Sequence, residues 1–275
     1  MKNIPVAKSK NCIIVAMIVL FLVACGTSKK AKKSSDGFTK LFNGKNWDGW
    51  YLKIRKEDPE LAKKVFQIEN GMVHVFKEVP EGSEVGNSDN PTHGLFYTNK
   101  TYSKFILKFE YKWGKNIANN YQQFQYDAGL YYHVVDDKIW PTGIEYQVRY
   151  NPENNKNHTG DYWGLAPYDW TADENNQFAF VNDGGKLQAA KKGEHLAKTP
   201  QNFNGLNDQW NQCEVIVMAN KYSIHKLNGE IVNMATNFVI SEGKIGFQSE
   251  TGELYYRNIR IKEFDEIVPM EQFLN

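Results

Sequence analysis

The sequence predicts an all-β protein in which two antiparallel sheets stack face to face. Long runs with helical periodicity are scarce, whereas short alternating or aromatic-rich runs bounded by Gly, Asn and Pro recur along the chain. Two Asn-Gly pairs add a signal that is typical of tight β-hairpins. Eight or more strands of this kind would close into a two-layered jelly-roll sandwich.

The expected elements follow in chain order. Hairpins are expected at Asn70-Gly71 and Asn228-Gly229, because this pair accepts the positive φ angles of a type I′ turn. Residues 57–64 predict one short helix with Pro59 in its first turn. The expected strands are 65–76 and 221–235, each with a hairpin turn inside it, and 104–113, 128–135, 143–150, 210–219, 243–250 and 254–264.

A long insertion interrupts the strand pattern between Asn151 and Thr199. It is rich in Asn, Gly and Asp, and a connection of this length in a compact domain is usually functional or disordered. Its aromatic content argues against disorder. Since nothing resembles a second linker, residues 37–275 are expected to form one β-sandwich domain.

The N-terminus predicts export. Lys2, Lys8 and Lys10 precede an apolar run from Cys12 to Ala24, which is typical of a signal peptide over residues 1–24. The run ends in LVAC and resembles a bacterial lipobox, which implies cleavage before Cys25 and a lipid on its sulfur. An uncleaved anchor is the alternative. We therefore expect a lipid-anchored protein of the bacterial cell envelope, periplasmic or surface-exposed.

Charge and cysteine content narrow the partners further. Residues 25–36 form a flexible tether with four lysines, which favours the membrane surface. Residues 37–275 hold 26 basic and 31 acidic side chains, so nucleic acid is excluded as an expected partner. Cys213 alternates with apolar residues, which predicts a buried structural thiol.

The stretch PTGIEYQVRY, residues 141–150, carries unusual polar side chains for a strand. If it alternates, Glu145, Gln147 and Arg149 share one face while the intervening apolar residues face the core. On a curved sheet the polar face would become a groove. The alternative is an ordinary solvated sheet surface.

Seven pieces of the chain carry a resemblance when they are taken together in order. The pieces are GFTKLFNGKNWDGW (37–50), FILKFEYKW (105–113), DAGLYYHV (127–134), GIEYQV (143–148), TGDYWGL (159–165), QWNQCEVIVMANKYSIHKLNGEIV (209–232) and GKIGFQSETGELYYRNIRIKEF (243–264). They span nearly all of the chain after the signal and tether, and this ordered set resembles the 3-keto-disaccharide hydrolase domain family.

This resemblance implies a concanavalin-A-like jelly roll and a substrate class. The substrate would be an oligosaccharide or other glycoside whose hydroxyl at carbon 3 has been oxidised to a ketone, which implies an upstream sugar 3-oxidoreductase as a partner. A ketone at carbon 3 acidifies the hydrogen on carbon 2. Such an enzyme needs a base near carbon 2, a positive or hydrogen-bonding group at the enolate oxygen, and an acid or metal for the leaving group.

Four residues are the expected catalytic groups. Glu145 lies in the EYQ piece and would act as base or metal ligand; a solvated carboxylate is the alternative. His225 and Arg257 match further family pieces. His225 would serve as base or ligand, with a hydrogen-bonded structural histidine as the alternative. Arg257 would hold an oxyanion or Glu145, with an arginine bound to structural carbonyls as the alternative. His133 shares the predicted strand face of Tyr131, but it departs from the Arg that the family commonly has there.

The expected substrate-binding residues are polar or aromatic. The tryptophans would stack on sugar rings, and the polar side chains would bind hydroxyls. The acidic segments 89–91 and 135–138 lack the spacing of a calcium loop, so a divalent metal stays open without support from the sequence. The candidates are Gln147, Glu110, Trp163, Trp140, Trp170, Asp161 and His158.

Two other classes of function stay open at this point. A non-catalytic, lectin-like protein could use the same groove to bind carbohydrate without a productive base. A conventional glucanase would need two carboxylates at a defined separation, and no strand carries acids two or four residues apart in the EXDXXE manner.

Overall fold

The computed structural model describes residue 1 and residues 34–78, 90–119, 126–164, 167–190 and 193–274. Nearly all regular structure in these ranges is β-strand, and every pairing between named strands is antiparallel, as the sequence predicts. No helix in the described ranges is long and apolar enough to cross a membrane. The described helices are α1 (Pro59–Val65) and the short 3₁₀ turns η1 (Val181–Asp183) and η2 (Met270–Phe273).

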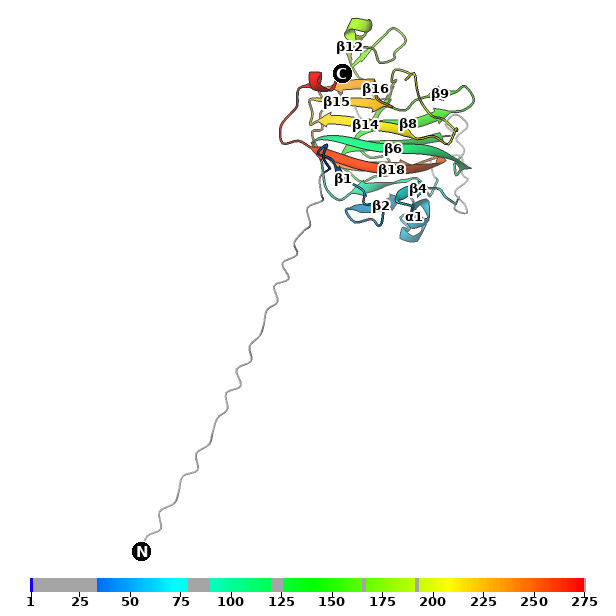
Figure 1. The fold of residues 1–275 in the computed structure, drawn as a ribbon, viewed down its shortest axis with the longest axis vertical. Coiled ribbons are helices and arrows are strands. Elements are labelled where there is room, and N and C mark those ends of the chain that lie inside the picture. Colours follow the sequence, from blue (N-terminus) through cyan, green and yellow to red (C-terminus); the bar gives the residue numbers. More distant parts are fainter. Residues whose placement is uncertain (2–33, 79–89, 120–125, 165–166, 191–192, 275) are drawn as a thin grey trace. The chain divides into compact units, whose positions relative to one another are not determined.

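The larger sheet, here called the front sheet, has ten strands within the described ranges. Figure 1 shows β15, β14, β6 and β18 of this sheet lying side by side. The strand order is β12-β11-β16-β15-β14-β6-β18-β4-β3, and β1 pairs with β18. Its strands are β1 (Thr39–Lys40), β3 (Phe66–Glu69), β4 (Met72–Val75), β6 (Lys104–Ile117), β11 (Asp169–Ala172), β12 (Lys186–Ala189), β14 (Asn211–Met218), β15 (Tyr222–Leu227), β16 (Glu230–Thr236) and β18 (Gly252–Glu263).

The second sheet, here called the back sheet, has eight strands in the part of the chain that the structure describes. Its order is β13-β10-β8-β7-β17-β5-β2, and β9 pairs with β8. The strands are β2 (Trp50–Ile54), β5 (Gly94–Thr98), β7 (Tyr126–Val134), β8 (Ile144–Asn151), β9 (Lys156–Asn157), β10 (Tyr162–Gly164), β13 (Gly193–His195) and β17 (Lys244–Ser249).

The two sheets enclose an aromatic-rich core. Phe109 of the front sheet lies 5.2 Å from the Phe247 ring and 5.9 Å from the Tyr146 ring of the back sheet. Phe247 in turn stacks on Phe96 at 5.0 Å. Large rings packed edge-to-face in this way bury much apolar area, which is the main source of stability for a sandwich. Cys213 belongs to this core, as predicted.

Local turn chemistry also agrees with the sequence. Asn70 and Gly71 have φ angles of 49° and 79°, and Asn228 and Gly229 have φ angles of 49° and 89°, so both pairs form the predicted hairpin turns. Helix α1 begins after Asp58, whose carboxylate accepts hydrogen bonds from two backbone N–H groups of the first turn at 3.0 Å each.

The predicted insertion is ordered where the structure describes it. It contributes β9, β10 and β13 to the back sheet and β11 and β12 to the front sheet. Strands β10 and β13 extend the back sheet beyond β8. The insertion therefore supplies one side of the surface on which the polar residues of β8 lie.

Candidate functional site

The face of the back sheet that points away from the core holds a pocket of about 730 Å³. The predicted alternation along β8 is correct, because Ile144, Tyr146 and Val148 belong to the core while the polar residues between them line the pocket. These polar residues are not an ordinary wet surface, since Glu145 is only 2% exposed. The pocket is lined by Asp127, Tyr131, Trp140, Pro141, Thr142, Glu145, Gln147, Arg149, Trp163, Gly164, Gly193, Glu194 and Glu250.

Strand register brings four pocket residues into one row. Glu145 on β8 pairs with Tyr131 on β7 and with Trp163 on β10. Trp163 pairs in turn with Glu194 on β13. Directly paired residues project their side chains to the same face of a sheet. Trp163 and Glu194, both from the insertion, thus lie in the same row as Glu145.

Gly129 leaves the space that the Glu145 carboxylate occupies. A Cβ atom at Gly129 would lie 1.9 Å from Oε1 of Glu145. The next residue along β8 on this face, Gln147, pairs with Gly129. Its amide donates hydrogen bonds to the Asp127 carboxylate and, at 3.1 Å, to the carbonyl oxygen of Ala128. Gln147 is therefore fixed by protein contacts on the pocket floor.

Arg149 supplies the positive charge among the described lining residues. It pairs in register with Asp127, and its Nη2 donates to a carboxylate oxygen of Glu194. Arg149 is 6% exposed, so this guanidinium acts at low dielectric on the acids around it.

The acids of the pocket hold their protons unusually tightly. Burial raises the pKa of Glu145 well above its usual range, and the charges of Asp127 and Glu194 add to the effect, while Tyr131 and Arg149 oppose it. Burial likewise raises the pKa of Asp127. Burial and the Glu145 charge raise the pKa of Glu250 to about 8. Carboxyl groups shifted in this way can exchange protons near neutral pH.

Two further side chains lie next to Glu194 and bear on the question of a metal. His158, Asp161 and Glu194 offer ligand atoms that all lie within 4.8 Å of one another. However, Nδ1 of His158 is 2.9 Å from the Asp161 carboxylate, and Glu194 already accepts from Arg149. The other oxygen of Asp161 accepts from the backbone N–H of Ala197 at 2.6 Å. This donor set fits an internal ion network better than a metal site.

His225 does not reach the pocket, which corrects the prediction of a catalytic role. It lies on β15 with its ring between the sheets, stacked at 3.9 Å on Tyr162. Nδ1 bonds the carbonyl oxygen of Gly160 at 2.8 Å, and Nε2 bonds the hydroxyl of Tyr132 at 3.1 Å. Burial lowers the pKa of His225 to about 3. It is a neutral, hydrogen-bonded core residue.

His133 also lies off the pocket face. Strand β7 has one extra residue relative to β17 between Tyr131 and Val134, and His133 adopts a φ of 53°. This bulge reverses the expected alternation. Tyr131 and Val134 share a small cluster on the pocket face, whereas His133 packs edge-on against the core ring of Phe105.

Arg257 and Glu110 lie on the opposite side of the molecule. They pair in register on β18 and β6 of the front sheet, and Nε of Arg257 donates to Glu110 at 2.6 Å. The guanidinium stacks 3.7 Å above the Trp210 ring. Their side chains alternate with core residues such as Tyr256 and therefore face outward. The prediction that they join Glu145 in one groove is wrong.

The predicted tryptophans divide between two places. Trp140 and Trp163 line the pocket and are each 44% exposed. Trp170 is buried in the core, where its indole N–H donates to Asn233 at 2.8 Å, so it cannot serve as a sugar platform. Gln147 lies in the pocket, and His158 and Asp161 adjoin it through Glu194.

Four pocket residues were missed by sequence reasoning: Asp127, Tyr131, Glu194 and Glu250. Alternation along 127–131 and pairing with β8 could have pointed to Asp127 and Tyr131. Glu194 comes from the insertion, and no local pattern predicts its position. The predicted lipidation site, Cys25, lies outside the described residues.

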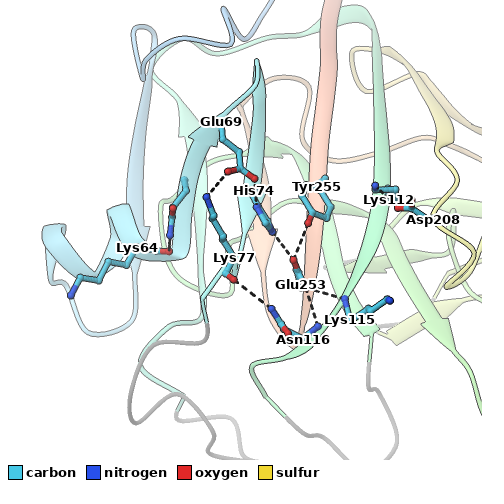
Figure 2. Close-up of polar contacts among 11 residues, drawn as sticks. Lys64, Glu69, His74, Lys77, Lys112, Lys115, Asn116, Asp208, Glu253 and Tyr255 are labelled. Atoms are coloured by element: carbon cyan, nitrogen blue, oxygen red, sulfur yellow. Dashed lines mark hydrogen bonds and ion pairs between the residues drawn. The ribbon is translucent and has the colours of Figure 1, made fainter.

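The outward face of the front sheet has its own polar cluster. Figure 2 shows His74 between the carboxylates of Glu69 and Glu253, with Tyr255 and the Asn116 backbone also directed at Glu253. His74 and Glu253 are 4% and 6% exposed. This cluster joins neighbouring strands of the front sheet.

A pocket that combines acids of shifted pKa with exposed aromatic rings is typical of a ligand-binding or catalytic site. The chain belongs to the family described as the 3-keto-alpha-glucoside-1,2-lyase-like domain, which matches residues 37–262. The resemblance seen in the sequence is thereby confirmed. Family membership makes this a carbohydrate-active, glycosyl-hydrolase-like protein.

Two solved structures from Parabacteroides distasonis are similar to this chain, and both proteins are provisionally named glycosyl hydrolases. One is 23% identical, with 84% of this chain and 95% of that chain covered and a TM-score of 0.51. The other is 15% identical, with coverage of 82% and 99% and a TM-score of 0.51. At these identities the likeness shows the jelly-roll fold. No curated protein sequence matches the chain.

Proposed function

We propose that the protein cleaves glycosides whose carbon-3 hydroxyl has been oxidised to a ketone. The observation that carries this proposal is the buried carboxylate of Glu145, which lies with Gln147 and Arg149 on the floor of the pocket. Family membership supports the substrate class.

In the proposed reaction Glu145 acts as the base. Its ionised carboxylate takes the hydrogen from carbon 2, and the electron pair of that bond enters the ring as the enolate of the carbon-3 ketone. The ketone then re-forms, the bond from carbon 1 to the aglycone oxygen breaks, and a double bond forms between carbons 1 and 2, while the departing oxygen takes up the proton that Glu145 holds, which regenerates the carboxylate. Water adds across that double bond and gives the 3-keto sugar. The raised pKa of Glu145 makes its ionised form a stronger base than an ordinary glutamate.

The neighbouring groups suit the charge that develops on the enolate oxygen. Arg149 offers a buried positive charge. Burial raises the pKa of Glu250 to about 8, so its carboxyl group is largely protonated at pH 7 and can donate a hydrogen bond. A preorganised donor in a dry pocket stabilises an oxyanion more than water does.

Two alternatives remain to be separated by experiment. The structure assembles Asp127 on β7, Glu145 on β8 and Glu250 from the turn after β17, so the lack of paired acids on one strand does not by itself exclude a conventional two-carboxylate glycosidase. The exposed tryptophans would also suit a lectin-like protein that binds sugar without cleaving it.

The decisive experiment uses a 3-keto-glucoside and its unoxidised parent, both carrying the same chromogenic leaving group. We expect release from the 3-keto substrate alone. Glu145→Gln should lower kcat by about 10²- to 10⁴-fold, the usual range for a general base. Glu110→Gln is the matched control, since it makes the same chemical change on the outward face of the front sheet.

Each alternative predicts a different result. Cleavage of the parent at a similar rate would indicate a conventional glycosidase. Binding of both compounds without release would indicate a lectin-like protein. Equal loss of activity in the Glu145 and Glu110 variants would remove Glu145 from the mechanism.

The ketone must be formed before this protein can act. We therefore propose a sugar 3-oxidoreductase as the upstream partner, because an unoxidised glycoside has no acidified hydrogen on carbon 2. We also propose that the protein works in the bacterial cell envelope, lipid-anchored at Cys25. The signal-like sequence before that cysteine supports this location.

A further inference from the structure

The pocket changes in character along β8. Glu145 is the second residue of the strand, and Gln147 and Arg149 follow it, with Arg149 paired to Asp127 of β7. Trp140 and Pro141 precede the strand, Gly164 pairs with Ile144, its first residue, and Trp163 pairs with Glu145. The charged side chains thus extend from Glu145 toward the end of β8, whereas tryptophan, proline and glycine surround Glu145 on the side where β8 begins.

Both tryptophans at this end are held in place but left open to solvent. Among the seven tryptophans of the chain, Trp140 and Trp163 are the most exposed, at 44% each. Trp163 is fixed within β10 between Glu145 and Glu194. The Trp140 ring packs edge-on against the His93 ring at 5.5 Å. Exposed aromatic rings with fixed positions on one pocket are typical of a ligand-binding surface.

Among the described residues, the apolar end offers few free hydrogen-bonding side chains to a ligand. Of the acids that flank Trp163, Glu145 serves the hexose and Glu194 already accepts from Arg149. The hydroxyl of Thr142, the other polar side chain here, already donates to Asp136 at 2.9 Å. The backbone N–H of Thr142 also donates to Asp136. A second sugar placed here would lose water from several hydroxyls without gaining partners, which is costly. A flat aromatic ring would lose little and would stack on the indoles.

We propose that Trp140 and Trp163 form a subsite for an aromatic aglycone, joined to the hexose site at Glu145. The assignment rests on the proposed function for the hexose end and adds the chemical class of the leaving group. A volume of about 730 Å³ has room for a hexose and an attached aromatic ring. The preferred substrates are aryl glycosides rather than disaccharides.

Binding measurements test this subsite without any chemical step. The Glu145→Gln protein is titrated with phenyl, methyl and glucosyl glucosides, each as both anomers and in both the 3-keto and unoxidised forms. For at least one anomer, we expect the phenyl glucoside to bind about tenfold more tightly than the methyl glucoside and the disaccharide of the same anomer. A gain of this size is modest for one stacked aromatic ring. Trp163→Ala and Trp140→Ala, each added to that protein, should abolish most of this difference.

Trp210→Ala is the matched control, because Trp210 lies on the outward face of the front sheet beneath Arg257. Its phenyl preference should be unchanged. Disaccharides that bind as tightly as the phenyl glucosides would overturn the proposal, and so would a phenyl preference that survives in both pocket variants. If the wild-type protein cleaves no 3-keto-glycoside but the phenyl preference follows Trp140 and Trp163, the proposed reaction fails while the aromatic subsite stands.

Discussion

At the scale of single residues, Gly129 controls where the Glu145 carboxylate lies. We predict that Gly129→Ala lowers kcat by about 10²-fold, because its new methyl group would overlap Oε1 of Glu145 and a displacement of about 1 Å has that cost. The atoms nearest to the new methyl group, Oε1, Cδ and Cγ, all belong to the Glu145 side chain and none to the backbone, so the thermal unfolding temperature should change less than the activity. Steady-state kinetics and thermal unfolding of the same samples check both expectations.

A second substitution distinguishes displacement of Glu145 from general damage. Glu145→Asp shortens the side chain by one methylene and reduces the overlap with a methyl group at position 129, because it removes the atom at 1.9 Å while atoms near the Cδ and Cγ positions, at 2.7 and 2.9 Å, remain. In a double-mutant cycle, Gly129→Ala should therefore cost less in the Glu145→Asp background. Additive losses would mean that Gly129 acts on something other than the carboxylate.

The pH dependence of the reaction is a second residue-scale prediction. A base must be ionised to accept a proton, and burial raises the pKa of Glu145 well above that of an ordinary glutamate. The acidic limb of kcat/KM should therefore have its midpoint well above pH 4.5, and activity should fall again at higher pH, where Glu250, with a pKa of about 8, loses the proton that it donates. A flat profile from pH 5 upward, measured with the 3-keto substrate, would contradict this role.

At the scale of elements, the cluster in Figure 2 joins β4 to β18 and β6. Nε2 of His74 on β4 is 2.7 Å from Glu253 on β18, and the other oxygen of Glu253 accepts from the backbone N–H groups of Lys115 and Asn116 at 2.9 and 3.0 Å. The Tyr255 ring stacks on His74 at 4.0 Å. The contacts connect the hairpin at the edge of the front sheet to its central strands.

We predict that Glu253→Gln lowers the free energy of unfolding by about 1–3 kcal/mol at pH 7, the range for lost hydrogen bonds to a charged group. These hydrogen bonds lower the pKa of Glu253 to about 2 against the opposing effect of burial. The carboxylate therefore stabilises the fold fully above about pH 4.5, and this contribution is lost as the pH falls through about 2. Denaturant unfolding of both proteins at several pH values measures the difference.

An exposed acid provides the control for that experiment. Glu60 forms an ion pair with Lys63 at 2.7 Å, but its side chain is 78% exposed. Glu60→Gln should change the free energy of unfolding by less than about 1 kcal/mol. Equal effects of the two substitutions, or a Glu253 effect that persists unchanged at pH 2, would rule out a role of the Glu253 charge in joining the strands.

At the scale of the whole molecule, the sequence predicts where the strands lie better than it predicts the face of the sheet toward which each side chain points. Period-2 alternation placed Glu145 and Gln147 correctly, since β8 is regular. The same reasoning failed at His133, because one extra residue in β7 reverses its direction and nothing local marks the bulge. Strand β5 was missed, because it is buried on both faces and shows no alternation.

Long-range pairing explains the remaining errors at the site. His225 and Arg257 lie on strands of the front sheet, and a strand pattern does not state which sheet the strand joins. Glu194 reaches the pocket only because β13 pairs with β10. Side chains that meet through pairing of distant segments can be placed only once that pairing is known.

The anchor is the last whole-molecule prediction. The described sandwich begins at residue 34, and the family match begins at residue 37, so the proposed lipid on Cys25 is separated from the catalytic domain by the lysine-rich tether. We predict that Cys25→Ser moves the protein from the membrane fraction to the soluble fraction of the cell envelope and leaves kcat/KM within about twofold. Mass spectrometry should find the acyl chains on Cys25 of the wild-type protein alone.

Cys213→Ser is the control for the anchor, because Cys213 is buried in the core and its substitution should not affect fractionation. A wild-type protein that is soluble, or that remains in the membrane after Cys25→Ser, would show that the cysteine is not the anchor.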